Sequence, residues 1–240
     1  MLVEVCANSL ESAMNAEKAR ADRIELCSEL AVGGITPSYG LLKSIKENLQ
    51  IPVHVLIRPR SGDFTYTESE FGIMRRNIAL CVEMGFDGIV SGALHADGTL
   101  DLERTKTLVE LSGNLKFTFH RAFDWVRDPE NTLRQLEGLG VDHILSSGQE
   151  KSALEGIALL SQLNKVAAST VIMPGGGIHA GNVGVFKEKG FKVVHLSGTT
   201  YEQRMETVPK VSMNTPSFLR DQGVFVSNME VIRKVLKEVK

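Results

Sequence analysis

Short apolar segments alternate with amphipathic segments along most of the chain. The apolar segments predict strands at residues 2–6, 23–27, 53–58, 88–92, 116–121, 143–147, 170–174 and 193–197. The amphipathic segments predict helices at about 9–20, 38–49, 68–84, 101–112, 129–138, 152–166 and 180–189. Strands that alternate with helices in this way are typical of an α/β protein with parallel strands.

Local signals support the limits of several of these helices. Thr67 with Glu70, and Ser152 with Glu155, fit the capping box that begins a helix. Pro129 suits the first position of a helix that follows Asp128. Glycine stands near the end of several amphipathic segments, at Gly85, Gly113, Gly140 and Gly190.

The number of elements selects between two α/β architectures. Eight strands with seven intervening helices, in a chain close to the typical length of about 250 residues, predict a (β/α)8 TIM barrel. The main alternative is a doubly wound open sheet. We favour the barrel because polar residues end early, middle and late strands, and only a closed sheet brings all of them around one axis. Residues 1–198 would form this barrel as a single domain.

The strand–helix pattern fails after the eighth strand. Residues 199–226 are largely polar and irregular, and Ser227-Asn228 then begins a final amphipathic helix. A connection of this length suggests a lid, an arm on a neighbouring subunit or a disordered segment. We expect the tail and helix at 199–240 to complete the barrel or to contact a partner subunit.

Composition indicates an ordinary globular protein and excludes several classes of partner. The chain is 42% hydrophobic and 23% charged, and 27 Lys+Arg against 29 Asp+Glu give a net charge of -2. We therefore expect neither nucleic acid nor a membrane as a partner. Three cysteines and an N-terminus without a signal-like pattern favour a cytoplasmic protein with reduced thiols.

Polar and reactive side chains occupy alternate positions in four of the predicted strands. This pattern is unusual, because strands that are buried on both faces are normally apolar throughout. Alternation turns one set of residues toward the barrel axis: Glu4, Cys6, Glu25, Cys27, Thr118, His120, His195 and Ser197. The carboxyl ends of barrel strands carry functional residues. The sequence therefore predicts a functional site at that end.

Cys6 and Cys27 end consecutive strands, and neighbouring strands lie about 4.8 Å apart. Two thiolates side by side suit Cu(I), or Zn(II) if a histidine or carboxylate completes four-coordination. The alternative is that both cysteines are unligated and pack as small buried hydrophobic residues.

A set of acid–base candidates lies at the same end of the barrel. Glu25, His120 and His195 are suited to proton transfer, and Arg121 and Asp124 stand in the loop beyond His120. Taken singly, each is more simply a structural polar group with its hydrogen bonds satisfied. Together they favour a functional role, because a buried charged cluster without a function would cost desolvation free energy to no benefit.

Two glycine-containing turns suggest an anion site. Gly175, Gly176 and Gly177 follow the seventh strand, and Ser197-Gly198 follows the eighth, where barrels often bind phosphate through backbone N–H groups. Arg58, Arg60 and Arg121 would add positive charge. Alternatively, the glycines form a tight loop without a ligand, and Asp63 pairs with the arginines.

The motifs around these residues resemble those of the CutC family over residues 1 to about 198. The resemblance rests on Glu4-Val5-Cys6, residues 21–27, 33–38, 57–60 with Gly62-Asp63-Phe64, 118–124 and 173–178. Ser61 departs from it, because glycine is expected there. The resemblance implies a cytoplasmic TIM barrel linked to copper handling, a homodimer or higher homo-oligomer, and Cu(I) ligands that correspond to Cys6 and Cys27.

Two functions therefore follow from the sequence. The first is copper homeostasis, with Cu(I) bound by Cys6 and Cys27. The alternative is a TIM-barrel enzyme of unassigned activity that acts on a small anionic or phosphorylated substrate. A simple metal carrier has no evident use for the arginines, histidines and glycine loop, so the residues favour the enzyme while the resemblance favours copper.

Overall fold

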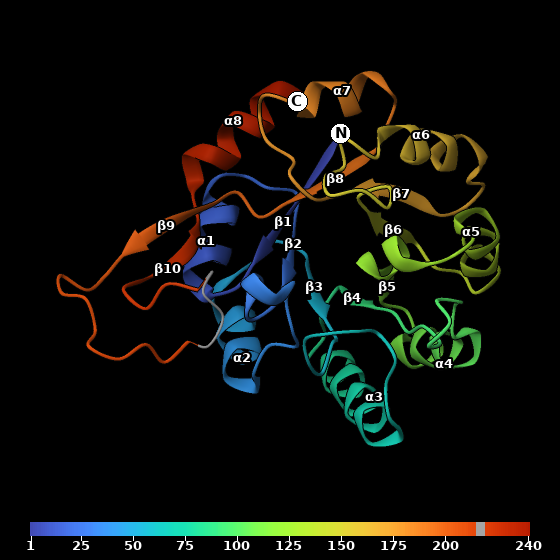
Figure 1. Cartoon of the computed structure of the whole chain (residues 1–240), viewed down its shortest axis with the longest axis horizontal. Coiled ribbons are helices and arrows are strands. Elements are labelled where there is room, and N and C mark those ends of the chain that lie inside the picture. Colours follow the sequence, from blue (N-terminus) through green and yellow to red (C-terminus); the bar gives the residue numbers. More distant parts are fainter. Residues whose placement is uncertain (215–218) are drawn as a thin grey trace.

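The computed structural model describes residues 1–214 and 219–240, and its centre is a barrel of parallel strands (Figure 1). Eight strands follow the order β7-β6-β5-β4-β3-β2-β1-β8, and an isolated parallel bridge between Gly175 and His195 joins the two ends. The strands are β1 (Leu2–Ala7), β2 (Arg23–Leu26), β3 (Val53–Leu56), β4 (Gly88–Ser91), β5 (Lys116–Phe119), β6 (His143–Ser146), β7 (Val171–Pro174) and β8 (Val193–Leu196). The predicted (β/α)8 barrel is confirmed.

Helices surround the barrel, as Figure 1 shows. They are α1 (Leu10–Lys18), α2 (Tyr39–Asn48), α3 (Glu68–Glu83), α4 (Leu102–Ser112), α5 (Pro129–Gly138), α6 (Ile157–Val166), α7 (Val183–Glu188) and α8 (Met229–Val239). Two short 3-10 helices, η1 (Leu30–Val32) and η2 (Arg121–Trp125), lie in the loops after β2 and β5. Within the described ranges, no helix has the length and apolar character that a membrane crossing requires.

The start of α6 differs from the sequence prediction, whereas that of α3 does not. The capping box of Thr67 and Glu70 begins α3 as expected. Ser152 and Glu155 also exchange their two capping hydrogen bonds, yet α6 begins only at Ile157. The backbone at Gly156 packs against Ser147 and Gly148 so closely that a Cβ there would lie 2.0 Å from the Ser147 carbonyl oxygen. This contact holds residues 152–156 in a separate turn.

The strands carry two different faces. Side chains that point outward, such as Val5, Ile24 and Phe119, are fully buried beneath the helices and form the main core. The inward residues of β1, β2 and β8 are largely polar. The register pairs Glu4 with Arg23 and Cys6 with Glu25 between β1 and β2, and Glu4 with His195 between β1 and β8. Strand pairing therefore sets these polar residues side by side.

The segment after β8 contains more regular structure than the sequence indicates. Residues 199–226 were expected to be irregular, but β9 (Thr199–Gln203) and β10 (Gly223–Ser227) pair as an antiparallel ribbon that projects beyond the barrel (Figure 1). Tyr201 and Phe225 pair across it, with ring centroids 5.4 Å apart. Residues 215–218 of this segment lie outside the described residues. The ribbon lacks the buried apolar pattern of the barrel strands, because most of its residues are exposed or only half-buried.

The final helix packs on the barrel. α8 lies against α7 and α1, and it buries Ile232, Val235, Leu236 and Val239. Ser227, which precedes it, is fully buried, and its backbone N–H donates to Ser12 Oγ at 3.0 Å. The last part of the chain thus packs beside α1, α7 and β1, the strand that supplies Cys6.

Candidate functional site

A buried ionic network occupies the interior of the barrel. Glu4 is fully buried; it accepts a hydrogen bond from Arg23 Nε through Oε2, while Oε1 lies 2.8 Å from His195 Nδ1. The remaining guanidinium nitrogens of Arg23 lie 3.4 Å from His143 Nε2 and 3.6 Å from the Met173 sulfur. These contacts follow from the register, because Arg23 and His195 are the partners of Glu4 on its two neighbouring strands.

The network sets the protonation of Glu4 and His195. Burial would raise the pKa of Glu4, but Arg23 and the hydrogen bond from His195 hold this pKa well below its ordinary range. Burial lowers the pKa of His195, yet Glu25 and Glu4 outweigh it, so this pKa is raised above 6.5. Since Glu4 is ionised, it accepts the Nδ1 proton of His195. In the neutral form of the ring, Nε2 is then the electron-pair donor, and a cation bound there would displace the Nε2 proton of the charged form.

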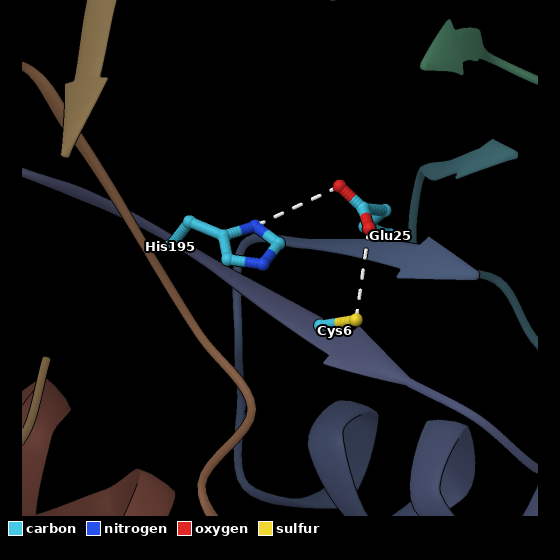
Figure 2. A group of neighbouring side chains, drawn as sticks. All are labelled: Cys6, Glu25 and His195. Atoms are coloured by element: carbon cyan, nitrogen blue, oxygen red, sulfur yellow. Dashed lines mark hydrogen bonds and ion pairs between the residues drawn. The ribbon is translucent and has the colours of Figure 1, made fainter. Parts of the chain in front are cut away.

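Two thiols and a carboxyl group lie beside this pair. Cys6 Sγ lies 3.5 Å from Cys27 Sγ and donates to Glu25 Oε1 at 3.6 Å. Glu25 Oε2 lies 3.9 Å from His195 Nδ1 and has no hydrogen-bond partner in the described part of the chain. Figure 2 shows Glu25 between Cys6 and His195, with one carboxylate oxygen toward each of them.

Burial and neighbouring groups raise the pKa of Cys6 and that of Glu25. The hydrogen bond with Cys27, burial and the nearby carboxylates raise the pKa of Cys6 well above 9.0. Burial raises the pKa of Glu25, although His195 opposes the shift. A cation bound here would displace protons and would be stabilised by the carboxylates that otherwise oppose thiolate formation.

The donor set can hold a metal ion. Cys6, Glu25 and His195 each present a ligand atom, and these atoms lie within 4.8 Å of one another. Cys27 adds a second sulfur from the fully buried position behind Cys6. A sulfur pair with one imidazole suits Cu(I), and inclusion of the Glu25 carboxylate would suit Zn(II).

A cavity of about 480 Å³ opens above this cluster at the carboxyl ends of the strands. Cys6, Glu25 and His195 line it, together with His120, Arg58 and Arg121. Phe64 and Trp125 contact each other at its wall, with ring centroids 4.8 Å apart. The structure thus brings the predicted metal and acid–base residues to one cavity, with Cys27 beneath it.

His120 lies at the end of β5, and its ring packs on Phe64 at a centroid distance of 4.8 Å. Nδ1 accepts a hydrogen bond from the Ala122 backbone N–H at 3.2 Å, so the neutral ring carries its proton on Nε2. Burial, and then Arg58, lower the pKa of His120 to about 3. Nε2 is buried and has no partner among the residues described.

Asp124 organises the loops around Arg121. Its carboxylate accepts hydrogen bonds from Ser146 Oγ at 2.6 Å, the Ser147 backbone N–H at 2.9 Å and Arg121 Nε at 2.8 Å. Arg121 also donates to Ser147 Oγ at 2.7 Å. Asp124 therefore positions Arg121, and its own oxygens are already occupied.

The residues of the predicted anion site are dispersed. Gly176, Gly177 and Ser197 line the cavity, whereas Gly175 packs against Leu145 and Gly198 packs against Ile232. Arg58 also lines it, but its Nη atoms donate to the carbonyl oxygens of residues 32, 34 and 62. Arg60 is directed to Glu70 and Asp63, outside the cavity wall. The carboxylates of Glu70 and Asp63, both near Arg60 in the sequence, account for the orientation of the Arg60 side chain.

Three further residues of the buried ionic network were not predicted from the sequence. Arg23, His54 and His143 are inward residues near Glu4, and burial lowers the pKa of His54 to about 3 and that of His143 to about 4. Arg23 shares a strand face with Glu25, so the same alternation could have identified it. Only the closed barrel shows that His143 contacts Arg23 and that the His54 ring lies 6.3 Å from the His143 ring, centroid to centroid.

Comparisons with known proteins agree with the sequence motifs. The CutC family model matches residues 1–200. A CutC family protein of Klebsiella pneumoniae (strain 342) is 46% identical over 196 residues, which cover 82% of this chain and 79% of that protein. One from Salmonella paratyphi A (strain ATCC 9150 / SARB42) is 40% identical over 226 residues, covering 94% and 87%. The solved structure of a candidate copper homeostasis protein, CutC from Streptococcus agalactiae, matches with a TM-score of 0.78 and 36% identity, over 82% of this chain and 98% of that one.

Proposed function

Since the chain belongs to the CutC family, we propose that it is a copper homeostasis protein that binds Cu(I) at the mouth of its barrel. The ion is held by Cys6 and Cys27, and His195 is the adjacent nitrogen donor. The description of the Streptococcus agalactiae relative as a candidate copper homeostasis protein supports this role. We place the activity in the cytoplasm, where free thiols stay reduced, and in a homodimer or higher homo-oligomer.

The distance between the two sulfurs carries the proposal. Cys6 Sγ and Cys27 Sγ are 3.5 Å apart. Two sulfurs that bind one tetrahedral ion at about 2.3 Å lie about 3.8 Å from each other. Only a small shift of either side chain would admit one ion, and soft sulfur donors favour Cu(I) over hard cations.

The surroundings of the sulfurs support a bound cation. Glu4 accepts the Nδ1 proton of His195, the arrangement that commonly orients a metal-binding histidine. Glu25 lies beside Cys6 and supplies negative charge when ionised. Because the pKa of Cys6 is raised, Cu(I) binding would release a proton and strengthen with increasing pH.

An anaerobic Cu(I) titration against a chromophoric competing chelator tests this proposal. The native protein, Cys6→Ala, Cys27→Ala and Cys81→Ala should be compared, with far-UV circular dichroism to verify folding. Cys81 is the matched control, because it is a fully buried thiol on α3 with a pKa raised by burial to about 12. We expect one Cu(I) per chain, bound with at least about 100-fold lower affinity when Cys6 or Cys27 is replaced, which corresponds to about 2.7 kcal/mol.

Two results would contradict a dedicated copper site. One is an unchanged affinity in the folded Cys6→Ala and Cys27→Ala variants. The other is an equal loss of affinity in Cys81→Ala, which would mean that copper is captured by free thiols in general. A parallel Zn(II) titration reports whether the Glu25 carboxylate shifts the metal preference of the site from Cu(I) toward Zn(II).

A further inference from the structure

The cavity has two walls of different chemistry. Cys6, Glu25 and His195 form one wall, from β1, β2 and β8. His120 and Arg121 stand on the other, at the end of β5 and in η2. In the order of the eight strands β1 and β5 are four places apart, so they face each other across the barrel. The second wall presents hydrogen-bond donors rather than sulfur or carboxylate groups.

His120 offers an unused donor on this wall. Its Nδ1 already accepts from the Ala122 N–H, which leaves the proton on Nε2. The side chain is 4% exposed, and Nε2 has no partner among residues 1–214 and 219–240. Buried polar groups are normally hydrogen-bonded, and His120 lines the cavity, so its unused donor indicates a ligand that supplies an acceptor.

Arg121 is held in place beside it. Asp124 and Ser147 bind its Nε and Nη2, and these bonds set the plane of the guanidinium group. Nη1 faces the backbone of Gly176, where a Cβ would lie 3.7 Å from it. Gly176 and Gly177 line the cavity with backbone alone, which leaves room for a group that binds the guanidinium. Arginine in a fixed orientation favours a carboxylate or phosphate.

We propose that the cavity binds a small organic molecule that carries an oxyanion group. Arg121 binds the oxyanion beside the Gly176–Gly177 backbone, and His120 Nε2 donates a hydrogen bond to a second oxygen of the molecule. This binding site goes beyond copper binding and is independent of it, because it uses the opposite wall. The volume of about 480 Å³ suits a small metabolite.

Trp125 provides a direct readout of this site. It is the only tryptophan of the chain, it lines the cavity, and it is 56% exposed. A ligand beside Arg121 would change the surroundings of the indole. Tryptophan fluorescence of the metal-free protein can therefore follow titrations with inorganic phosphate, glycerol 3-phosphate and glycerate, which separate phosphate from carboxylate recognition.

We expect saturable binding of glycerol 3-phosphate or glycerate. Inorganic phosphate should bind at least about 10-fold more weakly, because it has no organic part whose oxygen can accept the hydrogen bond from His120 Nε2. Arg121→Met should weaken binding of the oxyanion probes at least about 10-fold. Arg127→Met is the matched control, since Arg127 is exposed on the same loop but lies outside the cavity wall. Its affinity should remain that of the native protein.

Two substitutions at His120 separate ligand binding from local structure. Asparagine can keep the acceptor for the Ala122 N–H but lacks a donor at the Nε2 position, whereas glutamine places an amide nitrogen near it. His120→Asn should therefore weaken binding of the organic probes about 10-fold, and His120→Gln should restore most of the affinity. Cys27→Ala removes a proposed copper ligand that does not line the cavity and should bind the probes normally, so failure of the copper proposal would not affect this one.

The proposal is wrong if none of the three probes gives a saturable response, by fluorescence or by stabilisation against thermal unfolding. It is also wrong if Arg121→Met and Arg127→Met bind equally well. Equal affinity of the native protein for inorganic phosphate and glycerol 3-phosphate would remove the role of His120.

Discussion

Glu4 Oε1 lies 2.8 Å from Nδ1 of His195, and the two residues are register partners on β1 and β8. The other oxygen of Glu4 binds Arg23 on β2. One carboxylate therefore links three neighbouring strands inside the barrel. It also orients the imidazole that faces Cys6 and Glu25, so the stability of the fold and the geometry of the site depend on the same residue.

Replacement of Glu4 by glutamine should strongly destabilise the protein. The substitution leaves the Arg23 guanidinium, whose side chain is 7% exposed, without its ionic partner in the interior. Loss of one member of a buried ion pair costs about 3–5 kcal/mol. We expect the free energy of unfolding in urea to fall by at least about 3 kcal/mol.

Glu11→Gln is the control for this experiment. Glu11 pairs with Arg204 at 2.7 Å, but both side chains are about half exposed, at 51% and 50%. Exposed pairs contribute about 0–1 kcal/mol. If Glu4→Gln and Glu11→Gln lower the free energy of unfolding equally, the buried network is not the stabilising element that its geometry indicates.

Gly34→Ala should disturb the packing around the sulfur pair. A Cβ at Gly34 would lie 2.7 Å from Leu56 Cδ2 and 3.2 Å from Cys27 Cβ, and its φ is +82°. Gly85, with φ +68°, is the matched control, because within the described residues nothing lies within 4 Å of its added Cβ. Both variants incur left-handed backbone strain of about 1–2 kcal/mol.

Only Gly34→Ala adds overpacking, which should lower its free energy of unfolding by about 1–3 kcal/mol more than that of Gly85→Ala. Thermal or urea unfolding of the two variants should show this difference. Gly34→Ala should also change Cu(I) affinity, whereas Gly85→Ala should leave it unchanged. Similar stability of the two variants would show that the Leu56 and Cys27 side chains move aside without cost.

His120 should make stability depend on pH below neutrality. Burial and Arg58 lower its pKa from 6.5 to about 3 in the folded protein. As pH falls below 6.5, the unfolded chain gains a proton that the folded protein excludes, so the folded state loses stability progressively toward pH 3. The slope for one such group reaches about 1.4 kcal/mol per pH unit.

His120→Asn removes this titrating group while it keeps an acceptor for the Ala122 N–H. The free energy of unfolding of the native protein minus that of the variant should therefore fall by about 1.4 kcal/mol per pH unit between about pH 6 and 4.5. Urea unfolding at several pH values measures this difference, and other groups cancel because both proteins share them. If the free energies of unfolding of the two proteins change in parallel with pH, the pKa of His120 is not lowered in the folded protein.

Much of the site was predictable from alternation within single strands. The inward positions of Cys6 on β1, Glu25 on β2 and His195 on β8 follow from the two-residue period of a strand. Their convergence follows from the barrel, because parallel strands bring their carboxyl ends to one side. The arginines were less predictable, since a long side chain can turn toward any acceptor within reach.

The sequence by itself determined the order of the barrel strands and helices, the barrel architecture and many of the polar residues that face the axis, because hydrophobic periodicity is local. Only the tertiary structure decided the partners of these residues. Closure of the barrel set Glu4 between Arg23 and His195, and it joined Cys6 to both Cys27 and Glu25. Tertiary contacts also direct the Arg58 Nη atoms to the carbonyl oxygens of residues 32 and 34, and among the described residues they leave His120 Nε2 without a partner. Such pairings depend on distances between strands and loops, which no local pattern of residues contains.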